Sequence, residues 1–317
     1  MILPILLLIV GLALLLVGGE YFVRGSASLA KRSKISPMVI GLTVVAFGTS
    51  AAELMVNVMA ALKGTPDVAI GNILGSNIAN ILLILGIAAI IRPLTVKVDT
   101  IWKEIPLGVL AVLILFVLSA DKLLGSGGDN MLSLADGLVL LGFFVIFLSY
   151  TYGLSKQESK KDDVRSYSWS LTILFVLFGL AGLVGGAKLL VDNGVILARM
   201  AGLSELFIGL TIIAVGTSLP ELVASGIAAY RGHDELAVGN VAGSNIFNIL
   251  FILGLTPLIN PVPFNSAANG DVVITILAAL LLFFFMFIGK RHQLQRWQGV
   301  FMVITYLAYI TFITLRG

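Results

Sequence analysis

The sequence predicts an all-α integral membrane protein with ten transmembrane helices, arranged as two inverted five-helix repeats in which helices 2 and 7 are broken. The chain of 317 residues is 58% apolar and only 12% charged, whereas a soluble protein carries about 25% charged residues. The apolar residues form continuous runs of membrane length, which favours helices over a barrel. The first half of the chain is also repeated in the second.

Ten apolar runs follow one another along the chain, and a membrane-crossing helix needs about 20 mostly apolar residues. The first run lacks the basic start and the cleavage site of a signal peptide, so we expect it to remain as a helix. The predicted spans are approximately residues 2–23, 38–62, 68–91, 104–119, 131–152, 169–190, 206–229, 237–259, 271–289 and 298–315.

The internal repeat appears when the chain is shifted by 168 residues. GLTVVAFGTSAAEL at 41–54 shares 9 of 14 residues with GLTIIAVGTSLPEL at 209–222, and residues 71–86 share 12 of 16 with residues 239–254. Because five spans are an odd number, equivalent helices cross the membrane in opposite senses, as in many secondary transporters. The expected units are residues 1–154 (signature regions 41–57 and 71–86), a linker at 155–168, and residues 169–317 (signature regions 209–225 and 239–254).

The distribution of lysine and arginine predicts the orientation. With both termini outside and the 155–168 linker in the cytoplasm, fifteen basic residues fall on the inner side and five on the outer side. Positive charge gathers in cytoplasmic loops, so we expect a multi-pass protein of the cell membrane with this orientation. The basic residues flank membrane spans, so their partner is the lipid bilayer and not nucleic acid. The chain has no cysteine, which excludes disulfides and thiolate metal sites.

Two glutamates interrupt the apolar runs, Glu53 in GTSAAEL and Glu221 in GTSLPEL. An ionisable side chain at the centre of a bilayer costs about 2.5–3.5 kcal/mol, so it indicates a functional site. In a helix, each carboxylate shares a face with the hydroxyl groups three and four residues before it. Glycine and proline weaken the helix here, so we expect freed carbonyl groups to face a cavity. The residues concerned are Ala46, Thr49, Ser50 and Glu53, with Ala214, Thr217, Ser218 and Glu221 in the second repeat.

The second repeated motif reads GSNIAN and GSNIFN. Ser76 and Asn80, like Ser244 and Asn248, are four residues apart and share a helix face. Together with the glutamate motifs they offer only oxygen ligands, which suit calcium and sodium and disfavour zinc or copper. The neighbouring Asn77 and Asn245 are read in two ways, as ligands or as contacts between helices. Serine and threonine in membrane helices also commonly bond only to their own backbone.

At these residues the sequence resembles the cation/calcium antiporter superfamily, most closely the prokaryotic sodium/calcium exchangers. The resemblance covers nearly the whole chain. It implies electrogenic exchange of sodium for calcium by alternating access, with Ca²⁺ and Na⁺ as transported ions at four mid-membrane positions and no cofactor. Carried over to this chain, it implies Glu53 and Glu221 as central ligands, joined by Thr49, Thr217, Ser50, Ser218, Ser76, Ser244, Asn80, Asn248 and the carbonyl groups of Ala46 and Ala214.

Two departures from the family pattern matter. Ala51 and Ala52 stand where the family usually has Leu-Pro, so the first repeat lacks the proline that would break its helix. Asn248 stands where some relatives, including potassium-dependent exchangers, have aspartate, which favours potassium-independent exchange.

Other functions compete with sodium/calcium exchange. The nearest is proton/calcium antiport, or antiport of another divalent cation, by the same glutamates, because a carboxyl group in an apolar site can carry protons. An intramembrane hydrolase with Ser50 or Ser218 as nucleophile is disfavoured, since the two histidines, His233 and His292, fall in loops. A channel is disfavoured by the inverted two-fold arrangement. We therefore expect a transporter and not an enzyme, and a monomer, since each chain contains a whole site.

Overall fold

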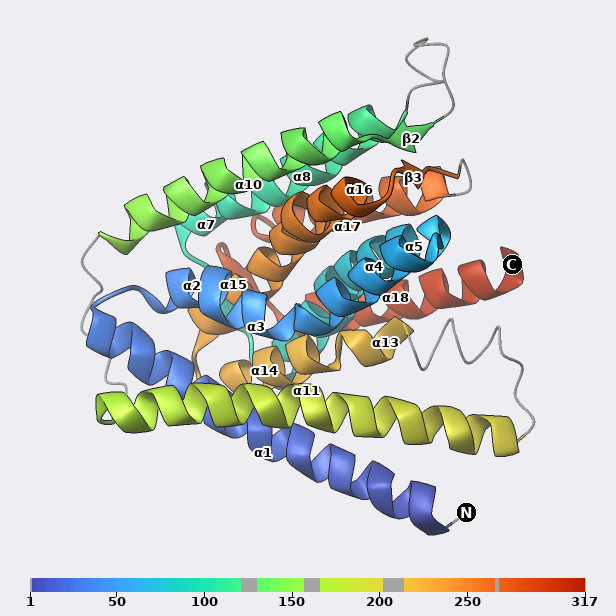
Figure 1. Ribbon diagram of the computed structural model, residues 1–317. Helices are drawn as coiled ribbons and strands as arrows, with labels where there is room; N and C mark the ends of the chain where they lie inside the picture. The colour runs from blue at the N-terminus through green and yellow to red at the C-terminus, as the bar shows by residue number, and fades with distance from the viewer. Residues whose placement is uncertain (1, 121–129, 157–165, 202–213, 266–267, 317) are drawn as a thin grey trace.

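The computed structural model describes residues 2–120, 130–156, 166–201, 214–265 and 268–316. In these ranges the chain is a bundle of helices with two short strand pairs (Figure 1). Seven of the described helices are long and apolar enough to cross a membrane, and an eighth is added if the bent pair Pro37–Thr49 and Ala51–Lys63 is one span. The predicted all-helical membrane fold is therefore confirmed. Part of the predicted span 206–229 lies outside the described residues.

The first half of the chain contains a long first helix, a broken second helix, and a third helix that is continuous but irregular. Its elements are α1 (Ile2–Ser33), α2 (Pro37–Ile40), η1 (Gly41–Val45), α3 (Ala46–Thr49), α4 (Ala51–Lys63), α5 (Pro66–Ile78), η2 (Ala79–Leu85), α6 (Gly86–Ile91), β1 (Leu94–Thr95), α7 (Val98–Trp102), α8 (Glu104–Ser119), β2 (Met131–Leu132) and α10 (Leu134–Ser155).

The second half follows the same order within the described residues. Its elements are α11 (Trp169–Met200), α13 (Ala214–Thr217), α14 (Leu219–Tyr230), α15 (Asp234–Ile246), η4 (Phe247–Ile252), α16 (Leu253–Ile259), β3 (Val262–Pro263), α17 (Asn269–Phe285), β4 (Gln293–Leu294) and α18 (Arg296–Arg316). The predicted ends of the first and sixth spans, residues 23 and 190, are too early. Both helices have 32 residues, because backbone hydrogen bonding continues past the apolar runs that defined the prediction.

The helices α1 and α11 pack closely and cross at the lower edge of the molecule in Figure 1. Glycines make this approach possible: a Cβ atom at Gly18 would lie 2.7 Å from the backbone of Gly182, and one at Gly186 would lie 2.6 Å from the backbone nitrogen of Leu15. Small residues let membrane helices approach to backbone contact.

Two antiparallel strand pairs connect the halves of the chain. β1 pairs with β4 through Leu94 opposite Leu294, and β2 pairs with β3 through Leu132 opposite Val262. Each pair joins a loop of the first half to a loop of the second. The two halves are therefore held together outside the helical layer as well as within it.

The helices that carry the GSN motifs form the centre of the bundle. Within the most apolar 18 residues of each helix, 78% are buried in the span Pro66–Ile91 and 89% in the span Asp234–Ile259. The corresponding fraction is 22% in α1 and in α11. The segments η2 and η4 within these two spans are π-helical, as is η1 in the broken second helix, and this distortion is frequent at functional sites. The centre of the bundle is thus where the repeated polar residues meet.

Candidate ion-binding site

Each glutamate motif contains a helix break at its serine, three residues before the glutamate. Ser50 has φ −75° and ψ 9°, and Ser218 has φ −89° and ψ 7°, whereas a helical residue has ψ near −42°. At Ser50 the chain bends by 47°. The predicted break in helix 2 is confirmed, although this repeat has alanine where the family has proline. In helix 7 the break lies between α13 and α14, and residues before Ala214 lie outside the described part of the chain.

The expectation that the break frees the Ala46 carbonyl group is wrong. The backbone N–H of Ser50 donates to Ala46 O at 2.9 Å, because the helical hydrogen bond closes before the chain bends. The hydroxyl group of Thr49 also lies 3.4 Å from Ala46 O, so both lone pairs of this carbonyl oxygen have a donor within reach. In the second repeat the N–H of Ser218 donates instead to Val215 O at 3.2 Å.

The two glutamates are completely buried, with 0% exposure, and each accepts a hydrogen bond from the other repeat. The hydroxyl group of Ser218 donates to Glu53 Oε1 at 3.3 Å, as does that of Ser76, and the hydroxyl group of Ser50 donates to Glu221 Oε1 at 3.1 Å. We expected each serine to lie beside the glutamate of its own motif. The pairing is crossed because the helix breaks at the serine, which separates the two side chains of one motif.

Four of the predicted site residues each have a buried acceptor oxygen with no hydrogen-bond partner among the described residues. These oxygens are Oε2 of Glu53, Oε2 of Glu221, Oδ1 of Asn80 and Oδ1 of Asn248. They form two repeat-related pairs, since 53 and 221, like 80 and 248, differ by 168. Buried polar atoms are normally satisfied, and leaving one unpaired costs about 1–3 kcal/mol. Carboxylate and amide oxygens are hard ligands, so this donor set fits calcium or sodium.

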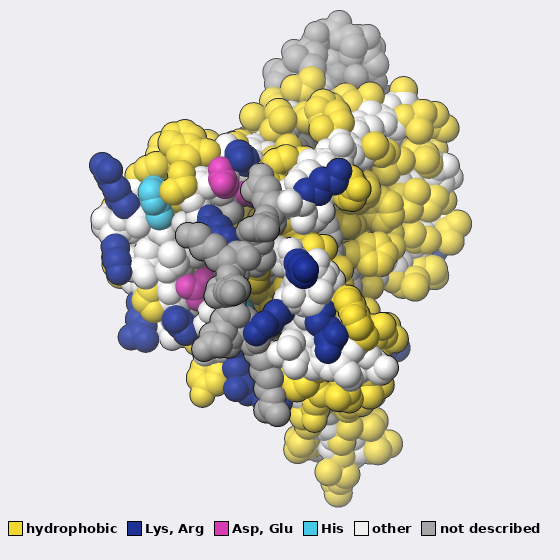
Figure 2. Space-filling view, turned by 90° about the vertical axis from the view of Figure 1, so that its left-hand side faces the viewer, with side chains coloured by type: hydrophobic (Ala, Val, Ile, Leu, Met, Phe, Trp, Pro, Cys, Tyr) yellow, Lys and Arg dark blue, Asp and Glu magenta, His cyan; other side chains and the backbone are white. Residues whose placement is uncertain are grey.

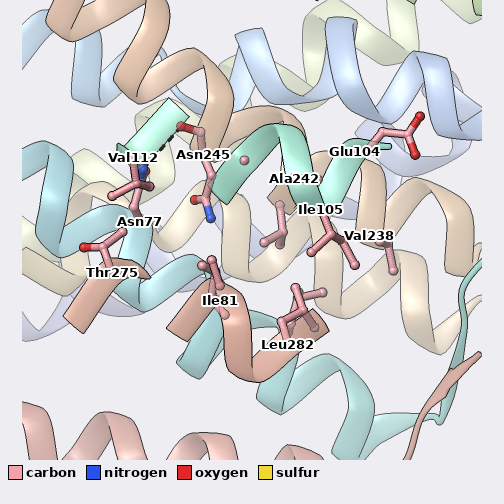
Figure 3. Close-up of a pocket in the computed structure, with 14 residues that line it drawn as sticks. Asn77, Ile81, Glu104, Ile105, Val112, Val238, Ala242, Asn245, Thr275 and Leu282 are labelled. Carbon is pink, nitrogen blue, oxygen red and sulfur yellow. Dashed lines mark hydrogen bonds between the residues drawn. The ribbon is translucent and has the colours of Figure 1, made fainter. Parts of the chain in front are cut away.

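The side-chain amides of Asn80 and Asn248 are held by hydrogen bonds across the two halves of the chain. Asn248 Nδ2 donates to Asn77 Oδ1, and Asn80 Nδ2 donates to Asn245 Oδ1, both at 3.0 Å. Asn77 Nδ2 in turn donates to the backbone oxygen of Asn245 at 3.2 Å (Figure 3). Asn77 and Asn245 are therefore contacts between helices that turn the amide oxygens of Asn80 and Asn248 away from themselves.

Two further asparagines support the glutamates and were not among the predicted site residues. Asn72 Nδ2 donates to the backbone oxygen of Glu53 at 3.3 Å, and Asn240 Nδ2 to that of Glu221 at 3.5 Å. The hydroxyl group of Thr49 donates to Asn240 Oδ1 at 3.1 Å. The signal was present in the sequence, because both asparagines follow glycine at identical positions of the repeat.

The remaining predicted ligands lie around the same centre, as far as the structure describes them. The hydroxyl oxygens of Thr49 and Ser244 are 3.5 Å apart, and both side chains have 0% exposure. Thr217 is the last residue of α13, one position before the break, and Ala214 is the first residue of the same helix. The side chain of Ala214 lies outside the described part.

Known proteins resemble this chain over nearly its whole length. The sequence profile of the family described as "Sodium/calcium exchanger protein" matches residues 3–153 and 171–315. The chain belongs to the sodium/calcium exchanger family. It is 40% identical to "Putative antiporter CaxA" of Alkalimonas amylolytica over 321 residues, covering 98% of both chains. It is 30% identical to "Sodium/calcium exchanger MaX1" of Methanosarcina acetivorans over 341 residues, covering 96% of this chain and 97% of that protein.

A solved structure of an exchanger has the same fold. The sodium-calcium exchanger NCX_Mj, soaked with 10 mM Na⁺ and zero Ca²⁺, superimposes with a TM-score of 0.85 at 35% sequence identity, covering 98% of each chain. The predicted membership of the prokaryotic sodium/calcium exchangers is thus confirmed, and the protein is a multi-pass membrane transporter. Within the described residues of the present chain, no group of three or more Asp, Glu, His or Cys is placed to hold a metal ion. The site instead combines two carboxylates with neutral oxygens.

Proposed function

We propose that this protein is a secondary active antiporter that exchanges sodium for calcium by alternating access. The observation that carries the proposal is the set of four buried, unpartnered oxygens on Glu53, Glu221, Asn80 and Asn248. They come in equal parts from the two halves of the chain. The proposal is supported by the family profile and by the sodium/calcium exchangers among the similar proteins.

The coupling follows from competition for the two carboxylates. Glu53 and Glu221 carry the charge that one Ca²⁺ needs, and they can instead be shared by several Na⁺ ions with hydroxyl and carbonyl oxygens. Full occupancy by one ion excludes full occupancy by the other. If three Na⁺ exchange for one Ca²⁺, one net charge crosses the membrane per cycle, which couples transport to voltage by about 2.3 kcal/mol per 100 mV.

The architecture proposed with this function is ten spans in two inverted repeats, with both termini outside and the 155–168 linker in the cytoplasm. Asn248 supplies no charge, so we include potassium independence in the proposal. Each chain holds residues of both repeats around one centre, which supports a functional monomer in the lipid bilayer. Cysteines introduced singly at residues 63 and 231 test the orientation, since only the outer one should react with an impermeant maleimide on intact cells.

Calcium uptake into liposomes tests the function. Purified protein is reconstituted into liposomes, which are loaded with sodium and diluted into sodium-free buffer with labelled calcium. A second set of liposomes receives a matched pH gradient without sodium, and the calcium uptake of the two sets is compared. We expect uptake driven by sodium and increased by a membrane potential that favours the net charge movement. Glu53→Gln and Glu221→Gln should each abolish uptake, and wild-type rates in either variant would overturn the site.

The second candidate function is proton/calcium antiport by the same residues. It is supported by the burial of both carboxyl groups, each with an unpartnered oxygen that could hold a proton. Uptake driven by the pH gradient alone would establish protons as the counter-ion and leave both glutamates at the centre of the mechanism.

A further inference from the structure

A small cavity reaches the central asparagines from one end of the bundle. Its walls come from both halves of the chain: α8, the α5–η2 helix, α15 and α17 (Figure 3). Asn77, Asn245 and Thr275 lie at one end, and Glu104 and Val238 lie at the other. The cavity volume is about 30 Å³, which corresponds to about one water molecule.

The cavity shares Asn77 and Asn245 with the cluster of asparagines beside the candidate site. Asn245 follows Val238 by seven positions in α15, which is about 10 Å at 1.5 Å per residue. Asn77 and Asn245 form the wall between the cavity and the amides of Asn80 and Asn248, to which they are hydrogen bonded. The lining of the cavity thus includes Asn77 and Asn245 at one end and Glu104, the first residue of α8, at the other.

Glu104 is a buried acid that the exchange mechanism does not use. It is 2% exposed, its Oε1 accepts a hydrogen bond from the hydroxyl group of Tyr150, and its Oε2 has no partner among the described residues. The nearby bases are engaged elsewhere: Lys103 pairs with Asp99 at 3.0 Å and Lys97 with Glu235 at 2.7 Å. A buried acid in a membrane protein without a neutralising base indicates a site for an ion or a proton.

We propose that Glu104 is a second cation site, at the end of the cavity opposite Asn77 and Asn245, which binds Na⁺ and Ca²⁺ from one face of the membrane. This inference rests on the proposed exchange function. The Glu104 carboxylate and the Tyr150 hydroxyl group supply hard oxygen ligands of the type that both ions prefer. In the proposed topology this end of α8 faces the cytoplasm, so the site serves ions on the cytoplasmic side.

A purely structural role for Glu104 is the competing explanation, in which the carboxyl group only ties α8 to α10 through Tyr150. Glu104→Gln separates the two, because glutamine still accepts the tyrosine hydrogen bond but has no charge. The chain offers a matched control in Asp271, which lies in the first turn of α17 and accepts a hydrogen bond from Tyr309 at 3.3 Å. In the proposed topology, Asp271 faces the opposite side.

Calcium transport in right-side-out and inside-out membrane vesicles tests the inference. For Glu104→Gln we expect the calcium concentration for half-maximal transport to rise at least fivefold on the cytoplasmic side and to change less than twofold on the other. Asp271→Asn should leave the cytoplasmic value unchanged. A Glu104→Gln value within twofold of wild type on both sides, or an equal rise on both sides, would overturn the second site.

A binding measurement separates this inference from the exchange function. The Glu53→Gln/Glu221→Gln variant lacks both central carboxylates, so labelled calcium that it still binds in equilibrium dialysis belongs elsewhere. We expect about one weakly bound Ca²⁺ per chain, lost when Glu104→Gln is added. Equal binding with and without Glu104→Gln would refute the second site, whereas failure of the wild-type protein to exchange sodium for calcium would refute the proposed function.

Discussion

Replacing Ser50 by alanine tests the crossed arrangement of the ion-binding site. The substitution removes the hydroxyl group that donates to Glu221 Oε1 at 3.1 Å, across the interface between the two halves of the chain. A hydrogen bond to a charged group contributes about 1.5–3 kcal/mol, and 1.4 kcal/mol is a factor of ten in affinity. We therefore expect Ser50→Ala to bind calcium about 10- to 150-fold more weakly in isothermal titration calorimetry.

The control is a serine with comparable burial and no such contact. Ser26 in α1 is 0% exposed, against 2% for Ser50, and its hydroxyl oxygen has no hydrogen-bond partner among the described residues. Ser26→Ala makes the same chemical change away from the carboxylates, so its calcium affinity should stay within twofold of wild type. Weakening of less than threefold by Ser50→Ala, or an equal effect from Ser26→Ala, would refute the reasoning.

Three further predictions concern the rest of the molecule. Asn77→Ala leaves the amide group of Asn248 without its acceptor, at a cost of about 1–3 kcal/mol, and should weaken calcium binding at least fivefold; unchanged affinity would contradict the orienting role. Gly18→Ala places a Cβ atom 2.7 Å from the backbone of α11 and should destabilise the protein by about 1–3 kcal/mol, seen as a lower Tm, whereas Gly185→Ala, with no atom within 4 Å, should not. Calcium at 100 times its Kd should stabilise the wild type by about 2.7 kcal/mol, and a Tm rise of equal size in Glu53→Gln would contradict its role as a ligand.

The sequence was sufficient to single out polar residues that the structure brings together, but not to predict their pairing. Glu53, Glu221, Asn80 and Asn248 stand out because polar residues recur 168 positions apart within apolar spans, and the structure leaves an oxygen of each without a partner. Which serine contacts which glutamate depends on the backbone torsion at Ser50 and on packing against the other half of the chain. Neither is encoded in local spacing.

Other features were hidden for related reasons. The π-helical segment that contains Asn80 has no residue pattern of its own, since ordinary apolar residues form it under constraints from neighbouring helices. Asn77 could be read as a ligand or as a helix contact, and only the position of Asn248 decides between them. Asn72 and Asn240 could have been predicted, because the repeat preserves them as it preserves the glutamates.

The two strand pairs have the symmetry of a homodimer contact. β1 begins at residue 94 and β3 at residue 262, which is the repeat distance of 168, and each pairs with the other strand of the opposite half. An interface of this kind is self-complementary, as between two copies of one subunit related by a two-fold axis. The backbone bonds that join the two halves of the present chain would equally join them as two separate chains. Fragments divided within residues 155–168 and produced together should accordingly co-purify from the membrane, and their independent elution would argue against self-complementary halves.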